Sequence, residues 1–338
     1  MASRKKGLLR LIIIVIAVLC FFCTATGAAQ AQTAQLYLGG FPAGFVLNTT
    51  TVEVVGMCDV MTESGLQSPA RDGGLKTGDI IKSINGEEVT SAEEVTELLS
   101  KDIRRAEIKV LRDGEEVSLT VIPVKDVTTG KLRVGVLVRD SLSGVGTVTY
   151  INGTDNTFAS LGHPVTDTAG NTTKINGGTL YGCIIYDVKR GVRGNPGELK
   201  GAFQNSKSIG VAALNCDCGV FGDLEKNYDY SSLTPVQAGK IEDVTPGKAV
   251  IYSTVSSNKT ECYEISIVKV DKTAKDNRNF VIKIEDEDLI EKTGGIVQGM
   301  SGSPIVQNGK LVGAVTHVFI NDPTRGFGIS IENMLKSY

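Results

Sequence analysis

The 338-residue chain has no tryptophan, only two histidines, and aromatic side chains at 6% of its positions. Its formal net charge of −3 is too small to create a field that would select nucleic acid. The seven cysteines include a Cys216-Asp217-Cys218 motif, but no second cysteine pair or histidine cluster accompanies it. The sequence therefore predicts no metal site and no other cofactor. Because there are only two histidines, few residues can serve as a general base.

An apolar run follows a basic segment at the N-terminus. Four basic residues lie between positions 4 and 10, and the uncharged stretch from residue 11 to residue 31 ends in Ala29-Gln30-Ala31. This order is typical of a secretory signal, but about 20 such residues can also span a bilayer. Residues 1–31 are expected to be a signal peptide or a membrane anchor. The rest of the chain is then extracytoplasmic and membrane-associated.

Most of the chain is predicted to be β structure. Thirty-nine glycines and many short runs of Val, Ile and Thr favour strands over helices. From residue 132 onward, short apolar runs alternate with turn signals such as Asn308-Gly309. Residues 132–338 are therefore expected to form a double β-barrel, preceded by a short polar linker over residues 125–131.

The segment from Leu66 to Val89 carries several closely spaced structural signals. Asn85-Gly86 predicts a type I′ hairpin turn, because both of its central residues need positive φ. Ser91 with Glu94 forms a capping box at the start of the next helix. The run G-L-K-x-G-D-x-I-x-x-I-N-G that ends at Gly86 resembles the PDZ domains of bacterial proteases. The resemblance covers residues 37–124.

The PDZ resemblance implies that this region binds a peptide. In PDZ domains the peptide adds as a strand, and a glycine-containing loop binds its carboxylate. The stretch most similar to that loop is Phe41-Pro42-Ala43-Gly44-Phe45. Ala43, Gly44 and Phe45 are therefore expected to be the peptide-binding residues. The alternative is a PDZ fold that serves only as a scaffold or docking face.

A glycine- and serine-rich turn, Gly299-Met300-Ser301-Gly302-Ser303-Pro304, lies between two apolar β-branched pairs. It can be an ordinary hairpin turn. It can also expose a nucleophilic serine beside backbone N–H groups that stabilise an oxyanion. Ser301 is favoured over Ser303, because Pro304 restricts the backbone of Ser303.

The two histidines differ in their sequence surroundings. His163 lies between Gly162 and Pro164 after a short apolar run, where a side chain can face a cleft. His317 is flanked by apolar residues that alternate as in a half-buried strand, which is typical of a structural residue. His163 is therefore favoured as the general base.

These motifs together resemble known serine peptidases. The turn is similar to the G-D-S-G-G-P signature of chymotrypsin-like enzymes. Its flanks, with Leu161-Gly162-His163 and Cys218-Gly219-Val220, resemble the SpoIVB-type sporulation serine peptidases. The resemblance implies a triad of His163, Asp286 and Ser301, and oxyanion donors at Gly299 and Ser301. Asp286 lies within an acidic run, and Asp167 is the alternative acid.

The same resemblance implies a signalling role. Enzymes of this kind process themselves and cleave a membrane-bound regulator of an intramembrane protease, which leads to activation of a late mother-cell sigma factor. They act between the forespore and mother-cell membranes, and the PDZ domain binds the enzyme's own chain. One alternative is an HtrA-like extracytoplasmic quality-control protease, although in those enzymes the PDZ domain follows the peptidase. The other is a non-catalytic PDZ adapter.

Overall fold

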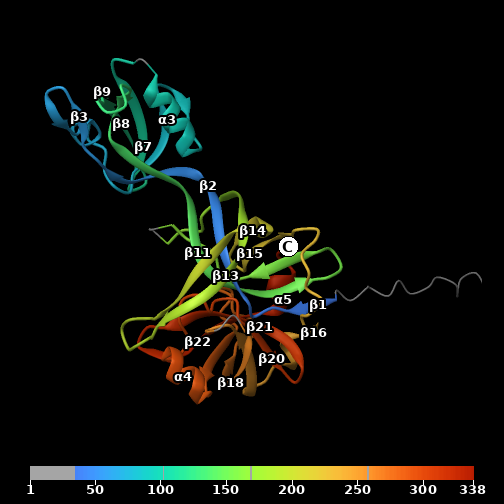
Figure 1. Ribbon diagram of the computed structural model, residues 1–338. Coiled ribbons are helices and arrows are strands. Elements are labelled where there is room, and N and C mark those ends of the chain that lie inside the picture. Colours follow the sequence, from blue (N-terminus) through green and yellow to red (C-terminus); the bar gives the residue numbers. More distant parts are fainter. Residues whose placement is uncertain (1–34, 102, 168–169, 257–258) are drawn as a thin grey trace, which may run out of the picture. The chain divides into compact units, whose positions relative to one another are not determined.

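The computed structural model describes residues 35–101, 103–167, 170–256 and 259–338. The expected signal or anchor segment, residues 1–31, lies outside these residues. Across the described ranges, no helix is both long enough and apolar enough to span a membrane. The residues from Leu36 to Tyr338 form one compact unit that consists mainly of β-strands (Figure 1).

The first barrel is a closed antiparallel sheet of six strands. Its strands are β2 (Pro42–Met57), β11 (Val136–Asn152), β12 (Thr157–Ser160), β15 (Gly219–Leu224), β14 (Glu198–Cys216) and β13 (Ile175–Lys189). Each pairs with the next, and β13 pairs with β2 to close the barrel. Closure leaves no free sheet edge. The interior is apolar and includes Phe45, Leu47 and Phe158.

The second barrel has the same architecture. Its strands are β17 (Gly247–Ser253), β18 (Glu261–Val270), β19 (Phe280–Ile284), β22 (Asp322–Ser330), β21 (Lys310–Phe319) and β20 (Pro304–Gln307). They pair in this order, and β20 pairs with β17 to complete the ring. The expected double β-barrel is therefore confirmed.

Short elements connect the two barrels. β1 (Leu36–Leu38) pairs with β11 of the first barrel and with β16 (Pro235–Ala238), which lies parallel to β21 of the second. The remaining helices in this part of the chain are η1 (Ile241–Asp243), α4 (Glu287–Thr293) and α5 (Ile331–Leu335). Leu36 and Leu38 pack in one apolar cluster with Leu311.

The PDZ domain is built between the first two strands of the first barrel. Its elements are β3 (Val60–Thr62), β4 (Gly65–Gln67), α2 (Pro69–Asp72), β5 (Ile80–Ile84), β6 (Glu87–Glu88), α3 (Ala92–Ser100), β7 (Ala106–Arg112), β8 (Glu115–Val121), β9 (Val124–Lys125) and β10 (Leu132–Arg133). The predicted capping box of α3 is present. Asn85 and Gly86 both have positive φ, as the hairpin requires.

The glycine-aspartate motif of the PDZ domain forms a buried ion pair. The Asp79 side chain is 1% exposed, and its two oxygens accept hydrogen bonds from Arg112 Nε and Nη2, each at 2.7 Å. Burial alone would raise the pKa of Asp79. The hydrogen bonds from Arg112 and from the Lys76 N–H outweigh burial and lower that pKa below its usual value. The motif therefore joins the start of β5 to the end of β7.

Strand β2 belongs to both the first barrel and the PDZ domain, which corrects one prediction. Ala43, Gly44 and Phe45 pair with β11 on one edge and with β13 on the other. A strand with both edges paired cannot accept a peptide as an additional strand. These three residues are therefore part of the barrel wall and not a PDZ loop. The boundary at residue 37 is displaced accordingly, because residues 42–48 are barrel residues (Figure 1).

Candidate active site

The serine-containing turn connects α4 to β20 of the second barrel. Gly294, in the left-handed conformation, ends α4, and the chain then passes through Gly299 and Gly302 at φ of 96° and 94°. A Cβ atom on Gly302 would lie 2.1 Å from the Thr147 carbonyl oxygen and 2.5 Å from the Leu161 nitrogen. Glycine is therefore required here both for the backbone conformation and for the close approach of the first barrel.

Two buried threonines of β11 hold this turn from the opposite barrel. Thr147 Oγ1 donates to the Gly299 carbonyl at 2.7 Å, and the Thr147 N–H donates to the Ser301 carbonyl at 3.0 Å. Thr149 Oγ1 donates to the Gly302 carbonyl at 2.8 Å. Because both threonine side chains are shielded from water, these bonds fix the turn between the barrels.

The backbone N–H groups of the turn fall into two sets. Those of Met300, Gly302 and Ser303 donate to backbone carbonyls. Those of Gly299 and Ser301 have no acceptor among the described residues. They are the two groups predicted to bind the oxyanion, and unpaired donors of this kind are what such a site needs.

The two serines of the turn have different surroundings. Ser301 is partly exposed, and its Oγ donates to the Thr316 carbonyl at 2.8 Å. Ser303 is fully buried, and its Oγ donates to Ser253 Oγ at 3.1 Å. A substrate can therefore reach Ser301 but not Ser303.

His163 follows β12 at the end of the first barrel. Leu161 and Gly162, at φ of 65° and 71°, turn the chain at this point. The His163 side chain then lines a cavity beside the serine-containing turn. His163 Nδ1 lies 2.8 Å from the Pro164 carbonyl oxygen. A carbonyl can only accept, so Nδ1 carries the proton and Nε2 keeps its lone pair. Burial lowers the pKa of His163, so the ring is a neutral base at pH 7.

Ser301 and His163 line the same cavity, which has a volume of about 300 Å³. Gly299 and Gln298 of the turn also line it. The remaining wall comes mainly from apolar side chains of the first barrel: Phe45, Leu47, Leu142, Val145, Leu161 and Val165. The structure thus brings the predicted nucleophile, base and oxyanion donors together beside an apolar cavity. Such a cavity suits an uncharged side chain of a bound peptide.

His163 also lines a second, more polar cavity of about 240 Å³. Its charged side chains are Asp217, Lys275, Asp276 and Arg278. His317 lines it too, and the centroid of its ring lies 4.7 Å from that of His163. Burial lowers the pKa of His317 to about 4, and repulsion from Arg278, and from His163 when that ring is protonated, acts in the same direction.

The two carboxylates that the sequence suggested as the triad acid are used elsewhere. Asp286 is the N-cap of α4, where it accepts hydrogen bonds from the N–H groups of Leu289 at 2.9 Å and Glu264 at 3.4 Å. Asp167 accepts from the backbone and side chain of Asn171. Neither lines either of the two cavities described above. In this structure Asp286 therefore caps α4 and makes no hydrogen bond to His163, whose Nδ1 lies against the Pro164 carbonyl.

Sequence reasoning missed Asp217 and Asp276, the carboxylates in the His163 cavity. Asp217 lies in the turn between β14 and β15, and Asp276 lies between β18 and β19. The signal for Asp217 was its position directly after a strand that ends near the histidine. That position can be recognised only when the pairing of the strands is known.

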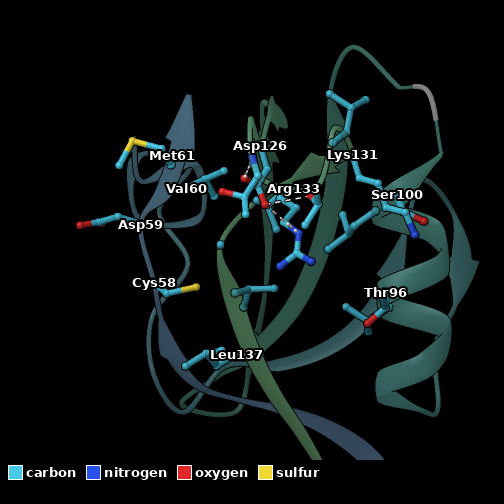
Figure 2. A pocket seen from close by; sticks show the side chains of 18 of the residues that line it. Cys58, Asp59, Val60, Met61, Thr96, Ser100, Asp126, Lys131, Arg133 and Leu137 are labelled. Atoms are coloured by element: carbon cyan, nitrogen blue, oxygen red, sulfur yellow. Dashed lines mark hydrogen bonds and ion pairs between the residues drawn. The ribbon is translucent and has the colours of Figure 1, made fainter. Parts of the chain in front are cut away.

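The PDZ domain has a groove of its own, of about 570 Å³ (Figure 2), and residues 43–45 do not line it. Figure 2 shows Thr96 and Ser100 on α3 at one side and Leu137 on the strand at the other. Gly135, at φ 73°, immediately precedes that strand, β11. Within the described ranges, the N–H groups of Val134 and Gly135 have no acceptor. The sequence signal that was missed is Gly135, because glycine readily adopts the positive φ found here.

Two closed six-stranded barrels, with an accessible serine from one and a neutral histidine from the other at a shared cavity, define a chymotrypsin-like serine peptidase. Residues 130–335 match the family described as SpoIVB peptidase S55, and residues 61–112 match the PDZ domain family. The chain belongs to the SpoIVB peptidase S55 family and is a serine peptidase.

More distant similarities fall on proteases as well. Serine protease HTRA1 of Xenopus tropicalis is 38% identical over 56 residues, which are 17% of this chain and 12% of that protein. Rv3671c protease in its inactive form is 15% identical over 57% of this chain and 81% of its own, with a TM-score of 0.33. The HtrA-type protease AlgW with a decapeptide is 15% identical over 58% of this chain and 51% of its own, with a TM-score of 0.35.

Proposed function

We propose that Ser301 is the nucleophile and His163 the general base of an endopeptidase that acts in sporulation signalling. The observation that carries the catalytic assignment is that both side chains line one cavity with the unpaired N–H groups of Gly299 and Ser301. Membership of the SpoIVB peptidase S55 family supports the biological role.

The reaction follows from the protonation state of His163. Ser301 Oγ–H turns from the Thr316 carbonyl to His163 Nε2, which accepts its proton as Oγ attacks the scissile carbonyl. The N–H groups of Gly299 and Ser301 stabilise the oxyanion. The imidazolium then protonates the leaving amine, and water hydrolyses the acyl-enzyme by the same steps. Hydrogen bonds of this kind commonly form only when substrate is bound.

In the proposed biological role, the enzyme acts between the forespore and mother-cell membranes. It processes itself near the N-terminus and cleaves a membrane-bound regulator of an intramembrane protease, and this cleavage leads to activation of a late mother-cell sigma factor. The N-terminal segment provides the membrane association. The PDZ groove beside α3 binds the enzyme's own chain before release and the target afterwards, in place of the site first expected at residues 43–45.

The test compares Ser301→Ala with Ser303→Ala, two changes in one turn. Ser301→Ala should stop self-processing, and should lower kcat on a target peptide by a factor on the order of a million. Ser303→Ala should remain active, because its hydroxyl is buried against Ser253. Mass spectrometry of the N-terminus and of the extracytoplasmic part of the regulator reads both activities. Continued cleavage by Ser301→Ala would contradict the proposal.

A further inference from the structure

We infer that the start of β14 forms part of the oxyanion site, by fixing the peptide group between Gln298 and Gly299. Gly197 and Leu199 are then positioning residues of the peptidase, although neither lines the cavity beside Ser301. The inference rests on the function proposed for Ser301 and deepens it, because it names the element that holds one of the two oxyanion donors.

Gln298 is hydrogen-bonded to β14 through both of its backbone groups. Its N–H donates to the Gly197 carbonyl, and its carbonyl accepts from the Leu199 N–H, each at 2.8 Å. These two bonds form an isolated parallel bridge between Gln298 and Glu198. At this end β14 pairs with β13 on one edge, whereas β15 pairs with the other edge only from Gly210 onward. The bridge therefore uses an edge of β14 that β15 does not cover.

The bridge determines where the Gly299 N–H points. A trans peptide group is planar, so its C=O and its N–H point in opposite directions. The Gln298 carbonyl points toward Leu199, and the Gly299 N–H of the same peptide group therefore points away from β14. This N–H has no acceptor among the described residues, and Gly299 lines the cavity beside Ser301. If the peptide group turned over, it would present a carbonyl oxygen to the oxyanion in place of a donor.

Burial of Leu199 opposes such a turn of the peptide group. Leu199 is 5% exposed and belongs to one apolar cluster with Val297 and Met300, which flank the peptide group. Turning the group over would leave the Leu199 N–H without its acceptor, and an unpaired buried donor is unfavourable. A Cβ atom on Gly299 would lie 3.0 Å from the Leu199 Cβ, so the side chain also lies against the turn. Backbone and side chain of Leu199 thus favour the same orientation.

The hairpin of β13 and β14 has further bonds to the second barrel. The Gly191 N–H donates to the Thr293 carbonyl at 2.7 Å, at the end of α4. The Gly194 N–H donates to the Ile320 carbonyl at 2.8 Å, in the connection between β21 and β22. Because these bonds do not involve Gln298, the bond from Leu199 can be removed while the hairpin stays docked.

The expected effect is confined to the steps in which negative charge develops on the substrate oxygen. The Gly299 N–H stabilises this charge in the transition state and contributes little to binding of an uncharged carbonyl group. Loss of the bond between Leu199 and Gln298 should therefore lower kcat without a comparable rise in KM. His163 takes no part in this contact, so the acid midpoint of kcat/KM should not move.

The experiment removes single backbone N–H donors in the full chain. The α-hydroxy analogue of leucine at position 199 replaces the N–H that donates to Gln298 by an ester oxygen. Glycolic acid at position 194 is the matched control, because it removes a bond of the same length, 2.8 Å, between the same hairpin and the second barrel. The ester at 199 should lower kcat by a factor on the order of 10 to 10³, and the ester at 194 should stay within about twofold of wild type.

Two inhibitors separate positioning of the donor from general damage to the site. A peptide aldehyde forms a tetrahedral adduct with Ser301 and uses the oxyanion donors, whereas the corresponding peptide alcohol forms no adduct. The ester at 199 should lose affinity for the aldehyde by about the same factor as kcat, and should bind the alcohol as wild type does.

Three outcomes decide against these proposals. Unchanged kcat and aldehyde affinity in the ester at 199, with an active wild type, would overturn the inference alone. Equal losses in the esters at 199 and 194 would also overturn it, because they would reflect docking of the hairpin and not the Gln298 peptide group. If wild type itself shows no Ser301-dependent hydrolysis, the proposed function fails and the inference with it.

Discussion

The rings of His163 and His317 lie with their centroids 4.7 Å apart and their planes at 39°. One ring comes from the end of β12 in the first barrel, and the other from β21 in the second. Burial lowers the pKa of both, in the case of His317 to about 4. The two histidines of the chain therefore meet where the barrels meet, and both are neutral at pH 7.

The first prediction concerns the acid limb of the pH–rate profile. Only neutral His163 can accept the Ser301 proton, and its pKa is below the ordinary 6.5. The midpoint of kcat/KM on the acid side should therefore lie below pH 6.5, since this parameter reports the free enzyme. His317→Ala should admit water to the His163 ring and raise the midpoint toward 6.5, whereas His317→Phe keeps a ring there and should change it less. A wild-type midpoint above 6.5 would contradict this expectation.

A second prediction uses two glycines that both have positive φ. Gly302→Ala places a Cβ atom against the Thr147 carbonyl, whereas Gly309→Ala meets no atom within 4 Å. Gly309→Ala should cost about 1 kcal/mol of backbone strain. Gly302→Ala should add about 1–3 kcal/mol of steric strain and also lower kcat, because the Ser301 turn must move. Urea unfolding and peptide hydrolysis measure the two effects, and equal losses in both variants would argue against the close approach.

The third prediction concerns the apolar cavity beside Ser301. Peptides with a Leu, Val or Phe next to the scissile bond should be cleaved faster than those with Ala or a charged residue, because the cavity walls are apolar. Leu142→Gln should reduce kcat/KM for the apolar peptides by roughly tenfold or more and reduce this preference. Val211→Gln, at an exposed position outside the cavity, is the matched control. Peptide panels in which the residues on each side of the scissile bond are varied show which substrate side chain enters the cavity.

The fourth prediction tests whether a peptide binds in the PDZ groove or at residues 43–45 of β2. Leu137→Asp should weaken binding of a peptide with an apolar C-terminus and a free carboxylate by roughly tenfold, as measured by fluorescence anisotropy. Leu66→Asp, also exposed but outside the groove, should bind normally.

Gly44→Ala tests whether residues 43–45 belong to the barrel wall and not to the peptide-binding site. A Cβ atom there would lie 2.4 Å from the Phe203 ring in the first barrel. This variant should therefore lose stability and hydrolysis but keep peptide binding. Loss of peptide binding in Gly44→Ala, with hydrolysis intact, would restore the original assignment of residues 43–45.

The sequence predicted those features that depend on a few adjacent residues. Asn85-Gly86 and Asn308-Gly309 are hairpin turns because only a few residue types tolerate positive φ. Ser91 with Glu94 caps α3 as expected. The choice of Ser301 over Ser303 also rested on local chemistry, and the buried position of Ser303 agrees with it.

Features that depend on strand partners could not be predicted in the same way. Ala43, Phe45 and Leu47 alternate as barrel residues do, but nothing adjacent in the sequence identifies β11 and β13 as their neighbours. Residues 287–293 had the local signals of a short helix, with Asp286 as the cap before them and Gly294 after them, but the acidic surroundings suggested a loop. Asp217 and His163 line one cavity only because of how β12, β14 and β15 pair.

The continuity of β2 limits how this peptidase can be divided. Its residues 42–48 close the first barrel, yet they precede the whole PDZ domain in the chain. A fragment that starts at residue 125 would retain Ser301 and His163 but leave β11 and β13 with unpaired edges, and exposed edges of this kind promote aggregation. A minimal active enzyme must therefore keep β2 and replace the PDZ domain with a short turn. The catalytic unit is contiguous in space but not in the gene.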